Sequence, residues 1–363
     1  MGLVEQLPTV YNNLLAAILI LLRTVHGYAA FLGCKMTVEC CRAWFPDHFD
    51  LTIGLEVSGY YLGGSFAILM GGYVYEACGY YAPYLTFALI ALTFWIYNIM
   101  AMPKTSDPVL KKPNNYVTET AIEAPWANEN GSSEEGMREV VPETVEEVVP
   151  CHGLSWLISI PLFAMSLTVV LEGFTAAIAT PYLNETFNVT IGRGSSYVFM
   201  QYLGLMAGAA SSGSILQLGW FSASKVMAIG SFLGVLGVLL VFPGEGIQLL
   251  YKLVPQLAYL GVFLQGYGSQ MIGVASLSAV EQMHTVIGQR SYSKSNKSAG
   301  ATLWLCVWMG AVYGGHLVAL MVMKYMSFTQ GGWMLAGFSA VSVAISILQD
   351  ITVNRFIDSS EPT

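Results

Sequence analysis

Three ionisable side chains lie inside long apolar runs of this sequence, where a charge is costly. Arg23 and His26 lie three residues apart, on one face of a helix through the first run, and Glu172 lies deep in a later run. An arginine at the centre of a membrane helix costs about 2.5 to 3.5 kcal/mol, so its side chain usually faces a partner or a cavity. An imidazole titrates near neutral pH, and an intramembrane carboxylate attracts a cation or carries a proton. These residues predict ion or proton chemistry inside a membrane.

Each of these residues also has a structural interpretation. Arg23 could be tied permanently to backbone carbonyls or to a carboxylate, instead of changing partners with a proton or a substrate. His26 favours its neutral form beside that cation, so it could be a hydrogen-bonded packing group rather than a proton shuttle. His316, in a later run, allows the same two interpretations. The sequence leaves these alternatives open, and the candidates for substrate or proton coupling are Arg23, His26, Glu172 and His316.

Aromatic residues are abundant in the same runs, and their rings could form a cage around a cationic substrate or anchor and pack the helices. They include Tyr60, Tyr61, Tyr73, Trp304, Trp308 and Tyr313. The sequence contains no phosphate-binding loop, no His/Cys metal cluster and no nucleophile elbow. We therefore expect no catalytic residue, no metal, no cofactor and no nucleic-acid partner, and we do not expect an enzyme.

Nine apolar helices are predicted to position these residues. The 363-residue chain is 55% hydrophobic and 10% charged, which is too apolar for a soluble protein of this size. A bilayer demands about 20 apolar residues per helical span, because a backbone without water must form its hydrogen bonds internally. The expected fold class is an all-α integral membrane bundle with spans near residues 14–34, 52–75, 83–102, 154–180, 195–219, 225–242, 253–276, 299–323 and 333–348.

A polar stretch divides the spans into three and six. Residues 103–152 are rich in Pro, Asn, Ser and Glu and have no periodic apolar face, so we predict a disordered linker there. Residues 1–102 then form a partial N-terminal domain of three spans. Residues 153–350 form a six-helix C-terminal domain, and residues 351–363 form a tail.

The Lys and Arg residues orient the spans, because positive charges in short flanks are retained on the cytoplasmic side. If the linker is cytoplasmic, eleven of the fifteen Lys and Arg residues lie inside, and only Arg193, Lys252 and Lys324 lie outside. The C-terminal tail is then cytoplasmic too. Asn184 and Asn188 each begin a glycosylation sequon in a loop that this topology places outside or in the lumen, so the sequence predicts a glycoprotein.

Two of the spans resemble known transporter helices. The run Leu19-Ile-Leu-Leu-Arg23-Thr-Val-His26-Gly27 resembles the fourth-helix signature of proton-coupled antiporters of the major facilitator superfamily, with His26 in place of the usual Gln. The second span, with Glu56, Gly59, Gly63, Gly71 and Gly72, resembles the glycine-lined fifth helix of these antiporters. Gly310, Gly314 and Gly315 stand in a frame similar to that of the eleventh helix. Within the superfamily the pattern is most similar to the vesicular amine transporter branch, including the region Thr180-Pro-Tyr-Leu-Asn-Glu-Thr-Phe187.

The resemblance implies a major facilitator-like bundle in which the nine spans are equivalent to helices 4 to 12, without the first three helices. It implies a secondary transporter of a small organic solute, expected to exchange protons for an amine-like organic cation bound between the two halves, in a vesicular or plasma membrane. The motif and helix-packing glycines are then Gly27, Gly59, Gly63, Gly71, Gly72, Gly310, Gly314 and Gly315. Because three helices are missing, the alternative is a non-transporting pseudo-transporter or membrane interaction protein that associates with a full-length relative.

Overall fold

The computed structural model describes residues 9–79, 81–101, 155–187, 191–242, 256–288 and 294–358. The contacts of the chain divide it into two units. One unit combines residues 1–79 with residues 149–363, and the other comprises residues 80–148. The predicted linker lies outside the described residues.

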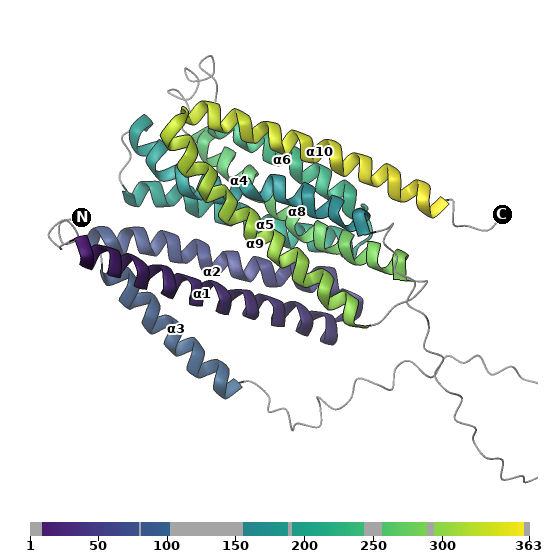
Figure 1. Cartoon of the computed structure of the whole chain (residues 1–363), viewed down its shortest axis with the longest axis horizontal. Helices are drawn as coiled ribbons and strands as arrows, with labels where there is room; N and C mark the ends of the chain where they lie inside the picture. The colour runs from purple at the N-terminus through teal and green to yellow at the C-terminus, as the bar shows by residue number, and fades with distance from the viewer. Residues whose placement is uncertain are drawn as a thin grey trace, which may run out of the picture. The chain divides into compact units, whose positions relative to one another are not determined.

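The described residues form nine α-helices and one short 3-10 helix, with no strand among them (Figure 1). The helices are α1 (Thr9–Trp44), α2 (Phe49–Cys78), α3 (Tyr81–Ala101), α4 (Ser155–Phe187), α5 (Ile191–Gln217), α6 (Ala223–Val241), α8 (Gln256–Gly288), α9 (Lys294–Tyr325) and α10 (Phe328–Asp358), and the 3-10 helix η1 (Pro46–His48) lies between α1 and α2. Each helix contains most of one predicted span. The predicted all-α fold is confirmed for these residues.

Five stretches of helix are long and apolar enough to cross a membrane, as a multi-pass membrane protein requires. They are Pro46–Cys78, Ile158–Ile178, Ala223–Val241, Ala299–Tyr325 and Phe328–Val353, and the apolar stretch of α3, Tyr81–Tyr97, is shorter. Helices α5 and α8 carry glutamines and serines that face neighbouring helices, and these lower their mean hydropathy. The prediction that all nine helices cross the bilayer stays a prediction.

The larger unit has a core to which segments far apart in the sequence contribute. Helix α2 packs against α5, α5 and α6 pack against α8, and α4 packs against α9. One cluster of buried side chains joins Ile53 and Tyr61 of α2 to Met165 of α4, Leu205 of α5 and Trp304 of α9. Figure 1 shows α1 and α2 side by side along this unit. The first two predicted spans therefore share a core with the later six.

We call the contact between α2 and α5 the α2–α5 seam, and glycines bring its two backbones close together. A Cβ atom built on Gly54 would lie 2.7 Å from the carbonyl oxygen of Ala209 and 2.9 Å from the Cα atom of Gly213. Near these glycines, the Ser58 hydroxyl donates to the Met206 carbonyl oxygen at 2.9 Å. Backbone atoms cannot rotate away from a new methyl group, so this crossing requires glycine.

We expect Gly54→Ala to destabilise the protein. The added methyl group must push α2 away from α5, and overpacking of this kind costs about 1 to 3 kcal/mol, more than the gain in helix propensity. The melting temperature of the purified protein should fall by several degrees, as measured by size-exclusion chromatography after heating. Gly59→Ala is the matched control, because no atom lies within 4 Å of its added Cβ. Equal melting temperatures for the two variants would contradict this account of the seam.

Candidate functional site

Glu172 is a buried carboxylate that receives hydrogen bonds from two other helices. Its side chain lies in α4, with 6% of the residue's surface exposed. Tyr61 of α2 donates its hydroxyl to Glu172 Oε1 at 2.9 Å, and Gln270 of α8 donates its amide to Glu172 Oε2 at 3.3 Å. The Gln270 amide also donates to the Tyr61 hydroxyl oxygen at 2.7 Å. Both carboxylate oxygens act as acceptors, which is the bonding pattern of an ionised carboxylate.

No cation among the described side chains forms an ion pair with Glu172. Two hydrogen bonds compensate part of the cost of burying a charge, but an intramembrane carboxylate without a counter-ion attracts a proton or a cation. The Glu172 carboxylate is therefore suited to bind a proton and to exchange it for another positive charge.

Two further glutamines extend this site. The Gln201 amide donates to the backbone carbonyl of Glu172 at 3.4 Å and to Gln265 Oε1 at 3.1 Å. Gln201 Oε1 and Gln265 Nε2 are buried and have no hydrogen-bond partner within the described part of the chain. An unpaired buried polar atom is costly, so both atoms are available to a ligand or a water molecule.

Aromatic rings from α2 and α5 cover one side of the site. The Tyr61 and Tyr202 rings meet edge to face with their centroids 5.7 Å apart, and the Tyr60 and Tyr61 rings do so at 5.2 Å. A Cβ atom on Gly64 would lie 2.8 Å from the Tyr202 ring, so the absence of a side chain at Gly64 makes room for this ring. Because Tyr61 lies before the linker in the sequence and Glu172 after it, the site joins the two segments of the chain on either side of the linker.

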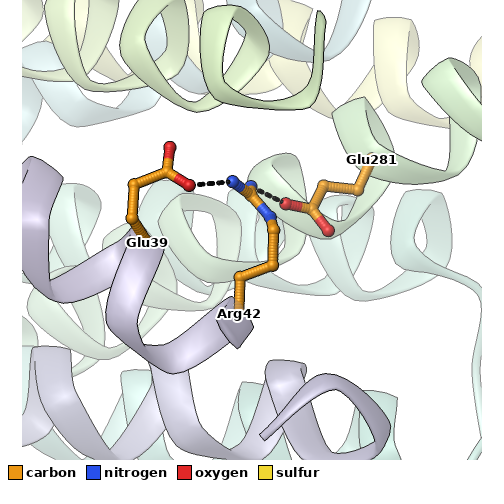
Figure 2. Close-up of polar contacts among 3 residues, drawn as sticks. All are labelled: Glu39, Arg42 and Glu281. Atoms are coloured by element: carbon orange, nitrogen blue, oxygen red, sulfur yellow. Dashed lines mark hydrogen bonds and ion pairs between the residues drawn. The ribbon is translucent and has the colours of Figure 1, made fainter. Parts of the chain in front are cut away.

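A second polar group lies toward the C-terminal ends of α1 and α8, and we call it the Arg42 cluster (Figure 2). Arg42 of α1 lies between two carboxylates, with Nη1 2.9 Å from Glu39 Oε2 and Nη2 in close contact with Glu281 Oε1 of α8. Burial lowers the pKa of Arg42, but the hydrogen bonds and charges of Glu281 and Glu39 outweigh it, and the pKa lies above its usual value. The guanidinium thus stays charged and holds α1 to α8.

Other contacts join the same segments near the Arg42 cluster. The Gln217 side chain, at the end of α5, donates its amide to the Asp47 backbone carbonyl of η1 at 3.0 Å. The Ser278 side chain of α8 lies beside the Asp50 carboxylate of α2. The start of α2 and the end of α1 are therefore tied to the six-helix segment by side chains as well as by packing.

The remaining predicted residues are distributed as follows. Arg23 and His26 belong to α1, but their side chains lie outside the described part of the structure. His316 of α9 is half-buried, and its Nδ1 lies 2.9 Å from the Val312 carbonyl of its own helix. Asn184 is part of α4, but its side chain is not among those described, and Asn188 lies outside the described residues.

The predicted glycines differ in their surroundings. A Cβ atom on Gly315 would collide with the Val170 carbonyl of α4, whereas one on Gly27 would make ordinary contact with the Tyr313 hydroxyl at 3.8 Å. Gly71 and Gly72 are half-buried in α2. No atom lies within 4 Å of a Cβ built on Gly59, Gly63, Gly310 or Gly314. Close backbone approach is therefore seen at Gly315, and the last four glycines border open space.

Sequence reasoning did not identify Gln201, Gln265 and Gln270, and it named Tyr61 only as an aromatic residue. The signal that points to the three glutamines is the one that points to Glu172, since each is a strongly polar side chain within an apolar run. Their meeting point depends on helix register, which the sequence alone leaves undetermined.

Comparisons with protein-family models, with curated proteins and with solved structures give no match to this chain.

Proposed function

We propose that this chain is a secondary active transporter, or a large part of one, that exchanges protons for a small organic cation. The observation that supports this proposal best is Glu172, a buried carboxylate that joins two segments of the chain and has no cationic partner among the described side chains. Transporters built from repeated bundles bind their substrate near the bilayer midplane between the repeats, and one bundle then rocks against the other.

Protonation of Glu172 provides a way to couple charge to movement of the seam. A proton on Oε1 makes that oxygen a donor toward the Tyr61 hydroxyl, so the hydrogen bond that Oε1 now accepts from Tyr61 must reverse or shift. The link between α2 and α4 then weakens or rearranges. A proton or cation that binds one arrangement of the seam better than the other shifts the equilibrium between the two arrangements.

The proposal includes the finer fold. A major facilitator-like arrangement is supported by the contact of α2 with α5, which brings the second predicted span against the six-helix segment. In this proposal residues 1–102 belong to the first half, residues 153–350 form the second half, and the linker and C-terminal tail face the cytoplasm. No chemical step on the substrate is involved.

Uptake into vesicles tests the proposal. The full chain is reconstituted into liposomes with an acidic interior, and uptake of labelled monoamines and polyamines is measured with and without the proton gradient. We expect saturable uptake that stops when an ionophore dissipates the gradient. Uptake of an anion or a neutral solute alone would overturn the organic-cation assignment. A chain that moves no solute, yet copurifies with a full-length transporter, would favour the alternative of a membrane interaction protein.

A further inference from the structure

A groove lies between α4 and α10, near the residues where α4 begins and α10 ends. Its volume is about 490 Å³, and it is partly open to the surroundings. Ile160 and Phe163 of α4 and Ile345 and Leu348 of α10 give it apolar walls. Small-molecule sites typically measure about 300 to 1,000 Å³, so the groove has room for one small apolar ligand.

A proline accounts for the space between the two helices. Further along α4 the helices are in direct contact, because Ser342 Oγ donates to the Ala164 carbonyl oxygen at 2.8 Å. The groove begins just beyond this contact, and Pro161 lies inside α4 beside it. A proline within a helix removes one backbone hydrogen bond and pushes the preceding turn aside. We attribute the separation of α4 from α10 at the groove to this residue.

Gln349 is the lining residue whose polar atoms lack partners. It is 2% exposed, and both its Oε1 and its Nε2 are buried with no hydrogen-bond partner in the part of the chain that the structure describes. Leaving an amide donor and an amide acceptor unpaired is costly. Rotation about the side-chain bonds of Gln349 can turn the amide toward the groove. A ligand group that both donates and accepts a hydrogen bond then satisfies both atoms.

The lining and its depth favour an uncharged, membrane-dissolved ligand. The described residues that line the groove include no Lys, Arg, His, Asp or Glu, so they offer no charge to a phosphate or ammonium head group. Gln349 lies about 6 Å before Val353, where the apolar stretch of α10 ends. In a membrane the amide therefore lies close to the interface, and the walls at Ile345 and Phe163 lie deeper in the hydrocarbon.

We propose that this groove binds a sterol from the bilayer. The sterol hydroxyl donates to Gln349 Oε1 and accepts from Gln349 Nε2, and the fused rings lie against Ile345 and Phe163. The stretch of α10 from Ile345 to Thr352 rises about 10 Å, which is close to the length of the fused rings and much shorter than an extended phospholipid chain. This lipid site goes beyond the proposed transport function and does not depend on it.

Photolabelling of the full chain in phosphatidylcholine nanodiscs tests the site without requiring transport. The probe is a cholesterol that carries a diazirine, and mass spectrometry locates the labelled peptides. We expect labelled peptides that contain Phe163 or Leu348, with labelling at least about fivefold lower in excess cholesterol. Cholesteryl methyl ether accepts a hydrogen bond but cannot donate one, and cholestane does neither. Both should compete at least about fivefold more weakly than cholesterol.

Substitutions at the groove separate the amide from the apolar walls. Gln349→Leu keeps a similar size and removes the amide, so labelling should fall at least about fivefold. The same variant should melt at a higher temperature than the parent in sterol-free detergent, because it removes a buried amide without partners.

A tryptophan in the groove and one elsewhere form a matched pair. Leu348→Trp places a large ring at the groove mouth and should prevent labelling, since Leu348 lines the groove and is 62% exposed. Leu320→Trp of α9 is the control, because Leu320 is 58% exposed and is not a lining residue. It should label as the parent does. Gel filtration establishes that each variant is folded.

Each result has a distinct meaning. The sterol assignment is overturned if the parent shows no saturable labelling at these peptides, or if Gln349→Leu or Leu348→Trp is labelled as the parent is. Competition by cholestane as strong as by cholesterol overturns it too. Saturable labelling of the same peptides by a photoreactive phosphatidylcholine, unaffected by cholesterol, would assign the groove to a phospholipid chain instead. Sterol labelling of a chain that transports nothing supports this site and counts against the proposed function alone.

Discussion

Replacing Glu172 with Gln is expected to abolish proton-driven uptake while leaving the protein folded. Gln has nearly the same shape, and its carbonyl oxygen can still accept the Tyr61 hydroxyl, so the packing around α4 should be retained. What disappears is the charge and the exchangeable proton. At an effective dielectric constant of about 20, a unit charge about 4 Å away contributes about 4 kcal/mol, so we expect at least about a hundredfold loss of uptake. Initial rates in proteoliposomes with a fixed proton gradient measure it.

Two companion variants separate a role in proton exchange from a structural role. Glu172→Asp retains a titratable carboxylate and should retain part of the uptake, with a changed pH dependence. Tyr61→Phe removes one hydrogen bond to the carboxylate, which should cost about 1 to 3 kcal/mol of stability, yet the carboxylate can still exchange a proton. Uptake by Glu172→Gln within twofold of the parent rate, in correctly folded protein, would leave Glu172 as a packing residue.

The helices could be predicted from hydropathy because each membrane-spanning helix needs one long apolar run. A run of about 20 apolar residues must be helical when no water can satisfy its backbone. The prediction was least accurate at the helix ends. Helix α1 continues from Cys34, where the first predicted span ends, to Trp44, and α10 continues from Leu348 to Asp358. These turns contain polar residues, so hydropathy does not detect them although the helix continues.

Glu172 could be recognised from the sequence because an acid within an apolar run is rare. Its partners could not be recognised, since Tyr61 lies 111 residues away and Gln270 lies 98 residues away. Which side chains meet depends on helix rotation and on the order in which helices pack, and neither leaves a local pattern.

The contact between Arg42 and Glu281 could not be predicted from the sequence. Charged residues outside the apolar runs indicate membrane orientation, and Arg42 counts there as one cytoplasmic charge among many. Nothing local distinguishes it from Lys35 or Lys104. Its contact with Glu281 spans 239 residues and is seen only in the folded chain.

We expect the Arg42 cluster to hold the predicted cytoplasmic end of the protein closed. Arg42 joins α1 to α8, and Gln217 and Ser278 make contacts near it, so this end of the seam carries several cross-links between the two segments. Breaking a partly buried ion pair leaves charges without compensation, which costs more than the loss of an exposed pair. Cys41, which is 8% exposed beside Arg42, reports on opening through its rate of labelling by maleimide.

In a variant that retains only Cys41, Arg42→Glu should raise the labelling rate at least about tenfold, because three carboxylates then face one another. Glu281→Arg should raise it as well, and the double swap Arg42→Glu with Glu281→Arg should return it to near the parent rate, since the opposite charges are restored. Lys225→Glu is the control, because Lys225 is 55% exposed and lies 4.0 Å from Asp350, so its pair contributes little. A double swap that labels as fast as Arg42→Glu alone would show that the pair does not close this end. Fast labelling of Arg42→Glu with uptake at the parent rate would place the gate elsewhere along the seam.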